Sequence, residues 1–317
     1  MRTKAEQKTQ IRNAAAASAA SLIAAAAAAA VALAVFRAGI AIAFIVFAVT
    51  FAVILCVLIL LWKKTDLLRK ILYVFYKIKH PKESRRCYCP CCGRTLAGFV
   101  DPGVTRDAEI YDPARFADQR QDVICPFCYS APRQRILASW AEDNKETLKR
   151  SKILYFAPEY SMMKWFRKNG IRLTTADLFD EKTDIRLDIT DIDLPGGSYD
   201  MVICNHVLEH VSSYEKALSE LNRILKDGGK LIISFPIDPK LDTVFEQEAE
   251  TAEERIRLFG QRDHVRVFGS DSAAVIGSFG FDVSVIDTSK MSASILPVTG
   301  PADYDSDQIF YCVKAAK

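Results

Sequence analysis

The chain begins with a long apolar block and continues as short apolar runs separated by polar segments. Residues 14–62 contain a single charged side chain, Arg37, whereas a membrane-spanning helix needs only about 20 apolar residues. This length predicts two spanning helices, at 14–36 and 40–62, joined by a tight turn at Arg37. The alternative is that only 40–62 spans, because alanine fills the first half and is less apolar than leucine or isoleucine.

Basic residues flank the apolar block on both sides. Residues 1–86 carry 14 Lys and Arg against 3 Asp and Glu. Under the positive-inside rule both ends of the block then face the cytoplasm. We therefore predict a basic cytoplasmic tail over 1–13, a transmembrane hairpin over 14–62 and a basic juxtamembrane helix or linker over 63–86. This is a multi-pass membrane protein with its other domains on the cytoplasmic side.

Beyond the apolar block the charge changes sign. Of the 42 Lys and Arg and 39 Asp and Glu in the whole chain, 28 and 36 remain after residue 86. Phosphate contact needs clustered Lys and Arg, so an acidic balance excludes a broad nucleic-acid surface. No nucleic-acid partner is expected. The sequence says nothing about oligomeric state.

Two Cys-x-x-Cys pairs follow the linker. Clustered cysteines in the reducing cytoplasm indicate a metal more often than disulfides, and four thiolates suit structural zinc with no open position. We predict a zinc-ribbon-like module over 87–150 with the ligands Cys89, Cys92, Cys125 and Cys128. Cys87 and Cys91 lie in the same run and leave the choice of the first pair open. The alternative is reduced cysteines without metal.

The spacing around these pairs carries two further expectations. The interval between the pairs exceeds that of a usual zinc ribbon, so 93–124 must hold an insertion or a long hairpin. Arg133 and Arg135 follow the second pair and are candidates for binding a phosphate, with solvated surface arginines as the alternative.

From residue 151 onwards, runs of strand length alternate with segments of helical periodicity. Three runs are continuously apolar, as expected for parallel strands covered on both faces: 153–156, 201–204 and 231–233. A helix at 215–226 and a Gly-Gly turn separate the last two. The pattern predicts a doubly wound α/β sheet that closes with an antiparallel pair at 280–286 and 308–314.

Ligands of such sheets bind at the carboxyl ends of the strands. The first turn, Phe156-Ala-Pro-Glu159, contains no glycine, although glycine lets the backbone approach a ligand closely. Asp177 ends the second strand 20 residues after Ala157, where an acidic residue hydrogen-bonds ribose hydroxyls. The alternatives are a strand-end cap for Asp177 and a helix cap for Glu159.

The segment after the fourth strand carries candidate catalytic groups, namely Asn205, His206, Glu209 and His210. His206 and His210 are four residues apart and share a face if this loop enters a helix. Such a histidine can remove a proton from a hydroxyl acceptor, or it can simply orient the loop. The pair could also bind a metal, but no third ligand is obvious.

A second polar cluster lies at 259–266, where Asp263 and His264 stand between Arg262 and Arg266. We expect this segment to cover the acceptor. The Glu-rich stretch 243–257 before it predicts an exposed helix that acts as a lid.

Three motifs resemble one family: Phe156-Ala-Pro-Glu159, Asn205-His-Val-Leu-Glu-His210 and Phe259-Gly-Gln-Arg-Asp-His-Val-Arg266. Together with the paired Cys-x-x-Cys knuckles they are similar to a bacterial methyltransferase-domain group within the class I S-adenosylmethionine-dependent methyltransferases. The resemblance covers 151–317 and implies a Rossmann-like seven-stranded sheet with S-adenosylmethionine as cofactor.

The resemblance also implies roles for single residues. The implied cofactor contacts are Ala157, Glu159, Asp177, Leu178, Asp188, Ile189 and Asn205, with Asp188 at the adenine amino group and Ile189 on the ring. The implied catalytic residues are His206, His210, Asp263 and His264.

We therefore predict a membrane-tethered methyltransferase that methylates an oxygen of a sugar or a lipid-linked glycan at the cytoplasmic leaflet. The alternative hypothesis is an inactive, zinc-containing scaffold that recruits partners to the membrane. The glycine-free turn favours the scaffold, and the Asp177, Asp188 and Asn205 pattern opposes it. A third hypothesis, methylation of protein or RNA through the knuckles, is disfavoured by the acidic charge.

Overall fold

The computed structural model describes a defined part of the chain, namely residues 21, 23–28, 30–31, 46–54, 57, 65–100, 122–288, 291–292, 294–296 and 308–315. The chain divides into two compact units, Met1–Pro81 and Lys82–Lys317. Each unit is described by itself.

The first unit corrects the predicted membrane topology. Among the described residues, no helix combines the length and the apolarity that a bilayer crossing requires. The two-span topology and the multi-pass localisation are therefore wrong. Much of 14–36 and 40–62, with the turn at Arg37, lies outside the described residues.

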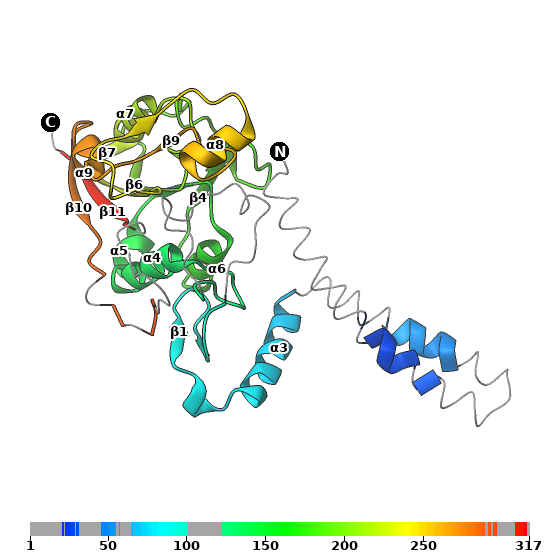
Figure 1. Cartoon of the computed structure of the whole chain (residues 1–317). Helices are drawn as coiled ribbons and strands as arrows, with labels where there is room; N and C mark the ends of the chain where they lie inside the picture. The colour runs from blue at the N-terminus through cyan, green and yellow to red at the C-terminus, as the bar shows by residue number, and fades with distance from the viewer. Residues whose placement is uncertain are drawn as a thin grey trace. The chain divides into compact units, whose positions relative to one another are not determined.

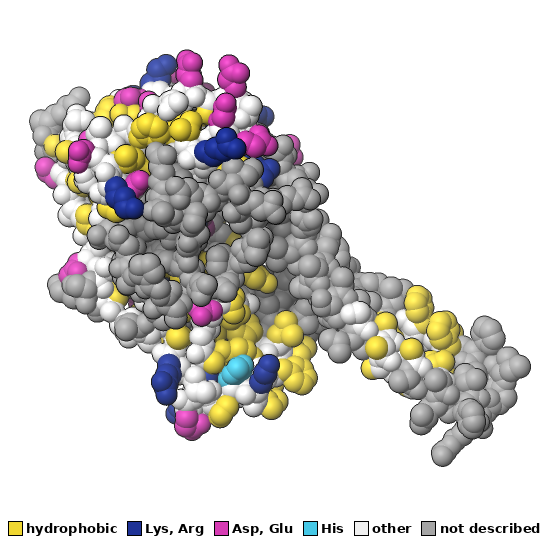
Figure 2. Space-filling model, in the orientation of Figure 1, with side chains coloured by type: hydrophobic (Ala, Val, Ile, Leu, Met, Phe, Trp, Pro, Cys, Tyr) yellow, Lys and Arg dark blue, Asp and Glu magenta, His cyan; other side chains and the backbone are white. Residues whose placement is uncertain are grey.

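Helix α3 (Thr65–Lys79) follows in the same unit and matches the predicted basic helix of 63–86 in position. Its last turn is basic, with Lys77 and Lys79. Apolar side chains gather over this helix in Figure 2. Among them Phe75 is 64% and Ile78 is 73% exposed. The helix is amphipathic rather than uniformly apolar.

The second unit is built on a seven-stranded sheet in the order β10-β11-β7-β6-β3-β4-β5 (Figure 1). Five strands run parallel: β3 (Ile153–Phe156), β4 (Thr174–Asp177), β5 (Ile185–Arg186), β6 (Tyr199–Asn205) and β7 (Leu225–Ser234). The last two are antiparallel to their neighbours: β10 (Phe281–Val285) and β11 (Phe310–Lys314). The prediction of a Rossmann-like sheet with a closing antiparallel pair is confirmed.

Alternation along the strands explains why both faces are covered. Leu154 and Phe156 of β3 belong to one core cluster, whereas Tyr155 points to the other face and its ring lies 6.1 Å from that of Phe166. On β11, Phe310 and Cys312 join the first cluster, while Tyr311 lies 5.6 Å from the Trp140 ring. Side chains that alternate with period two thus fill two separate layers.

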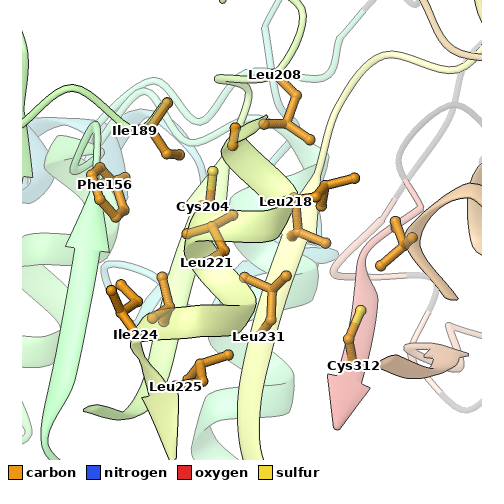
Figure 3. Close-up of a cluster of buried hydrophobic side chains, with 14 of the residues drawn as sticks. Phe156, Ile189, Cys204, Leu208, Leu218, Leu221, Ile224, Leu225, Leu231 and Cys312 are labelled. Carbon is orange, nitrogen blue, oxygen red and sulfur yellow. The ribbon is translucent and has the colours of Figure 1, made fainter. Parts of the chain in front are cut away.

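Helix α7 (Tyr214–Ile224) covers the first face. It begins at Ser213, whose hydroxyl accepts a hydrogen bond from the Lys216 amide at 3.2 Å. Leu218, Leu221 and Ile224 recur every three residues, are fully buried, and pack against the strands (Figure 3). The short helix α9 (Ser272–Gly277) buries Ile276 in the same cluster.

The predicted helix 215–226 ends early because Leu225 already pairs with Tyr199 of β6. Gly228 takes a φ of +68°, and a Cβ at Gly229 would meet the Lys226 carbonyl oxygen at 2.7 Å. The two glycines thus form an irregular start of β7 rather than a turn before it.

The second face is covered by helices α4 (Pro132–Asp143), α5 (Lys145–Arg150) and α6 (Tyr160–Lys168). Helix α6 buries Met162, Trp165 and Phe166 along one side, as its periodicity requires.

The cysteine module precedes α4. The 3-10 turn η1 (Lys82–Ser84) leads to an antiparallel hairpin of β1 (Cys87–Cys89) and β2 (Arg94–Leu96), and Val100 forms a bridge with Ile124. The predicted insertion within 93–124 falls largely on 101–121, outside the described residues.

A small antiparallel pair, β8 (Phe245–Glu246) and β9 (Arg266–Val267), stands beside helix α8 (Ala252–Phe259). The predicted helix at 243–257 is thus misplaced. It begins at 252 because Thr251 caps it reciprocally with Glu254, and it ends at Gly260, whose φ is +84°.

Candidate functional site

The carboxyl ends of four strands meet along one edge of the sheet. Phe156 of β3 lies opposite Ala176 of β4 and Cys204 of β6, and Asn205 lies opposite Ser234 of β7. The turn after β3, Asp177 and the loop after β6 therefore share this edge. These three expected contributors are brought together by the strand register alone.

Ala157 resolves the question of the missing glycine. Its φ is +46°, in the left-handed region that glycine normally occupies, and its amide donates to the Ala176 carbonyl at 2.9 Å. An L-residue pays roughly 1–2 kcal/mol for this conformation. The turn thus keeps the backbone shape of a glycine turn and adds only one methyl group.

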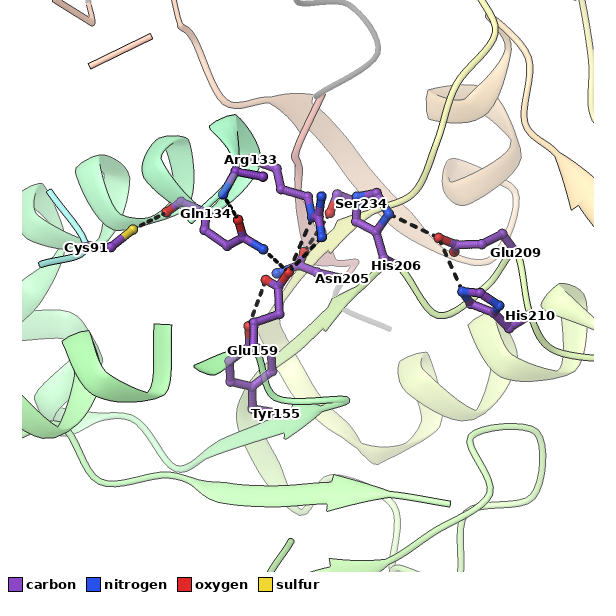
Figure 4. A network of polar contacts seen from close by, with 11 residues as sticks. Cys91, Arg133, Gln134, Tyr155, Glu159, Asn205, His206, Glu209, His210 and Ser234 are labelled. Atoms are coloured by element: carbon purple, nitrogen blue, oxygen red, sulfur yellow. Dashed lines mark hydrogen bonds and ion pairs between the residues drawn. The ribbon is translucent and has the colours of Figure 1, made fainter. Parts of the chain in front are cut away.

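Glu159 is held by three side chains from two other elements (Figure 4). Its Oε1 accepts hydrogen bonds from Gln134 Nε2 and, at 3.3 Å, from Arg133 Nε. The Tyr155 hydroxyl donates to Oε2 at 3.3 Å. Glu159 occupies the position before α6 but makes no side-chain cap there, so the capping alternative is wrong.

Asp177 uses one oxygen to close its own turn. Oδ1 accepts from the amides of Phe179 at 2.7 Å and Asp180 at 2.9 Å. These bonds fix the carboxylate plane and confirm the local cap, but they involve Oδ1 alone. Leu178 is half-buried, and Phe179 is 83% exposed beside it, an aromatic surface that sequence reasoning did not single out.

The neighbouring aspartates separate into different roles. Asp188 Oδ1 accepts from the amide and hydroxyl of Thr190 at 2.8 and 2.7 Å, and Ile189 is 4% exposed. Asp184 instead binds the amide and hydroxyl of Thr175, which hold the pKa of its carboxyl below the usual value. Asp184 is therefore part of the strand scaffold.

Asn205 and His206 end β6. Asn205 is 3% exposed, and its Oδ1 accepts from the Ser234 hydroxyl at 2.9 Å, which ties β6 to β7. His206 has a φ of +54°, and its amide donates to the Ser234 carbonyl at 2.7 Å. The chain then turns without entering a helix until Tyr214, so the expected helical face for His206 and His210 does not form.

Glu209 brings the two histidines together instead. Its Oε1 lies 3.1 Å from His206 Nδ1 and 3.9 Å from His210 Nε2 (Figure 4). The side chain is 1% exposed, and burial raises its pKa, but the contact with His206 and the charges of His264 and His210 outweigh burial and hold the pKa at about 2. Glu209 is thus a buried carboxylate at the centre of the loop.

Arg266 anchors that loop from the second polar cluster. Its guanidinium donates to the carbonyls of Leu208, Val211 at 2.6 Å and Ser212 at 3.3 Å, and to Glu246. The side chain is 3% exposed. Arg266 is therefore a buried residue that holds the loop after β6 in place through its backbone carbonyls.

The other members of this cluster lie at different depths. His264 is 3% exposed, burial lowers its pKa, and its Nδ1 lies 3.1 Å from the Phe259 carbonyl. Asp263 is 42% exposed, with Oδ2 3.5 Å from His210 Nδ1. His210 and Asp263 are thus the exposed pair, and His264 lies behind them.

The four predicted metal ligands form one cluster. Sγ atoms of Cys89, Cys92, Cys125 and Cys128 all lie within 4.8 Å of one another. Two of the separations are 3.5 Å, Cys89 to Cys128, and 3.9 Å, Cys92 to Cys125. Sulfurs bound to tetrahedral zinc at about 2.3 Å lie about 3.8 Å apart, so the donor set fits.

The spare cysteine and the arginines after the module have structural positions. Cys91 Sγ does not belong to the four-sulfur group and donates to the Gln134 carbonyl at 3.3 Å. Arg135 is fully buried and donates to the carbonyls of Val123 at 2.8 Å and Ser130 at 2.7 Å. Arg135 is therefore neither a phosphate-binding residue nor a solvated surface arginine. It holds the cysteine module together through these backbone contacts.

One family model matches part of the chain. Residues 147–233, from α5 into β7, match the family model described as Methyltransferase domain. The match includes β3, β4 and β6, whose carboxyl ends form the edge described above. It confirms the resemblance to S-adenosylmethionine-dependent methyltransferases. No curated protein matches the chain.

Three solved structures illustrate how remote the structural likeness is. An S-adenosylmethionine-dependent methyltransferase from Mesorhizobium loti is 15% identical with a TM-score of 0.41, over 57% of this chain and 98% of that one. YcgJ from Bacillus subtilis is 12% identical with a TM-score of 0.41, over 58% of this chain and 100% of that one. A methyltransferase from Archaeoglobus fulgidus is 15% identical with a TM-score of 0.38, over 58% of this chain and 94% of that one. At these scores the likenesses say nothing about activity.

Proposed function

We propose that this chain, which carries a methyltransferase domain, binds S-adenosylmethionine at the carboxyl edge of β3, β4 and β6 and transfers its methyl group to a hydroxyl acceptor. The family match supports methyl transfer in general. The observation that carries the site is the strand register, which aligns the Ala157 turn, Asp177 and Asn205 on one edge.

Each end of the cofactor has a proposed partner. Asp177 receives the ribose hydroxyls through its carboxylate, and Leu178, Asp188 and Ile189 receive the adenine. Glu159 receives the cationic amino group, since its carboxylate is already held in place by Arg133, Gln134 and Tyr155. The glycine-like backbone at Ala157 lets the methionine part approach the turn.

The cofactor supplies an activated methyl group, so the electron pair of the broken carbon–sulfur bond stays on sulfur. The protein then has to align the acceptor and remove its proton. His206 and His210 are the proposed bases, with His264 and Asp263 positioning His210. A hydroxyl is an acceptor that gains from such a base, because it is hardly ionised at neutral pH, and a sugar hydroxyl is the acceptor class we propose. We do not propose a lipid-linked acceptor, because that prediction depended on the spanning helices.

The scaffold hypothesis rested on the glycine-free turn. Because Ala157 adopts the conformation of the absent glycine, that argument no longer favours it.

Calorimetric titration of S-adenosylhomocysteine into the full chain tests the cofactor site. We expect micromolar binding in the wild type and a loss of roughly 10- to 100-fold in Asp177→Asn, because charge-assisted bonds to the ribose disappear. Asparagine keeps the Oδ1 acceptor that closes the turn. The exposed Glu181→Gln in the same loop is the matched control.

A folded wild type that binds no S-adenosylhomocysteine would refute the methyltransferase proposal and favour the scaffold hypothesis. Equal affinity in wild type and Asp177→Asn would refute only the ribose role of Asp177.

A further inference from the structure

We propose that Glu209, His210 and His264 form a second metal site, for a divalent transition-metal ion, at the loop after β6. One carboxylate oxygen and one nitrogen from each ring lie within 4.8 Å of one another. The ligands come from two segments, the loop after β6 and the loop before β9. The tertiary structure therefore groups His210 with Glu209 and His264, and not with His206 as the sequence had suggested.

The first argument is the orientation of the two rings. His210 Nδ1 lies 3.1 Å from the Asp263 carbonyl, and His264 Nδ1 lies 3.1 Å from the Phe259 carbonyl. A carbonyl only accepts, so each Nδ1 carries the hydrogen, and in a neutral ring each Nε2 presents a lone pair. Metal-binding histidines are oriented in this way, by a backbone carbonyl on the other nitrogen.

The second argument is the carboxylate. Both Glu209 oxygens are buried, and neither has a hydrogen-bond partner within the described structure. His206 Nδ1 lies close enough to Oε1, at 3.1 Å, for an ion pair but is not aligned as a hydrogen bond. Burying a carboxylate without donors is costly.

Two imidazoles and one carboxylate suit zinc and other first-row transition ions. Ligand atoms bonded at about 2.1 Å lie about 3.4 Å apart, so separations of up to 4.8 Å have to shorten by up to about 1.4 Å. His210 can turn to do so, since its side chain is 30% exposed, and its ring lies 4.7 Å from that of His264.

Three protein ligands leave a position open, in contrast to the closed four-cysteine cluster. On the proposed function, this position takes the acceptor hydroxyl. The metal would make the hydroxyl more acidic, and His206, which lies outside the metal-binding group, would take its proton. His210 would then act as a ligand and not as a base. This role rests on the proposed function, whereas metal binding itself does not.

Metal stoichiometry tests the proposal in the full chain. The protein is stripped with a chelator, reloaded with Zn²⁺, freed of excess metal and analysed for zinc per chain. We expect two ions in the wild type and one in both Glu209→Gln and His210→Gln. His206→Gln, a neighbouring histidine outside the group, should keep two.

Cobalt distinguishes the sites. The ion lost in the variants should be one without thiolate-to-cobalt charge-transfer absorption, because it has no sulfur ligand. One ion in the wild type, or two in a folded His210→Gln, overturns the proposal. The exposure of His210 makes that variant the one most compatible with folding. Calorimetry with S-adenosylhomocysteine on the same samples keeps this outcome separate from failure of the cofactor site.

Discussion

Ala157 and His206 are both non-glycine residues with positive φ, at +46° and +54°. They follow β3 and β6, two paired strands whose ends form the candidate site. Such conformations cost free energy and persist where surrounding contacts hold them, here the hydrogen bonds to Ala176 and Ser234. Two of the four positive-φ non-glycine residues in the described structure thus lie on the edge that we assign to the cofactor and acceptor, and the other two, Asp122 and Tyr129, lie beside the second cysteine pair.

Replacing Ala157 by glycine should relieve that strain. We expect Ala157→Gly to be stabilised by up to about 1 kcal/mol, since the left-handed conformation becomes free while the unfolded chain gains entropy. Urea unfolding measures the change. Ala176→Gly, in the adjacent strand, is the control and should be destabilised by about 1 kcal/mol or more. Equal destabilisation of both variants would contradict the assignment of strain to Ala157.

At the scale of elements, the start of β6 is fixed by one carboxylate. Asp200 Oδ2 accepts from the Lys152 amide at 2.7 Å, just before β3, and Oδ1 accepts from Lys226 Nζ at 2.6 Å in β7. These contacts join three neighbouring strands at the end opposite the site. At the site end, Arg266 holds the loop after β6 in the same manner.

The Asp200 contacts predict a pH dependence. Lys226 and then the Lys152 amide hold the pKa of Asp200 below its usual 3.8, so this stabilisation is present above pH 3.8 and is lost as pH falls below it. Asp200→Asn should therefore cost about 0.5–1 kcal/mol at pH 7 and less at pH 3. Urea unfolding at both pH values, with Asp282→Asn on edge strand β10 as charge control, checks this. A cost independent of pH would refute the ion pair as its source.

At the scale of the whole second unit, the cysteine module is connected to the candidate cofactor edge. Cys91 contacts the backbone of Gln134 in α4, and the Gln134 side chain holds Glu159 (Figure 4). Arg135 of the same helix ties α4 to Val123 and Ser130 beside the second cysteine pair. The module is thus placed to position Glu159 through α4.

Removing metal from the four cysteines should therefore weaken cofactor binding as well as stability. We expect a chelator to lower the melting temperature and the affinity for S-adenosylhomocysteine of the wild type, because α4 loses its anchor. Cys125→Ser in a His210→Gln background, which also lacks the proposed second metal site, should show the same losses without chelator and little further response to it. Cys312→Ala, a buried cysteine outside the cluster, should respond to chelator as the wild type does. If the chelator response remained in the variant that combines Cys125→Ser with His210→Gln, the response would have to come from a metal at another site.

The sequence by itself determined the architecture of the second unit. Continuous apolar runs such as 201–204 fix a strand buried on both faces, and the polar residues after each run fix the functional edge, because both features depend on local order alone. The Cys-x-x-Cys spacing likewise identified the four cysteines that the structure brings together. The apolar block predicted two spanning helices from composition, whereas no helix among the described residues is long and apolar enough to cross a bilayer.

Only the tertiary structure decided what surrounds each functional group. Cys91 is excluded from the cluster by its contact with Gln134, 43 residues away, and His210 meets Asp263 across 53 residues. Glu209 gains its neighbours and Arg266 its carbonyl partners in the same way. Such contacts depend on how distant segments pack, and no local pattern of residues encodes that packing, so the residues were visible in sequence but their partners were not.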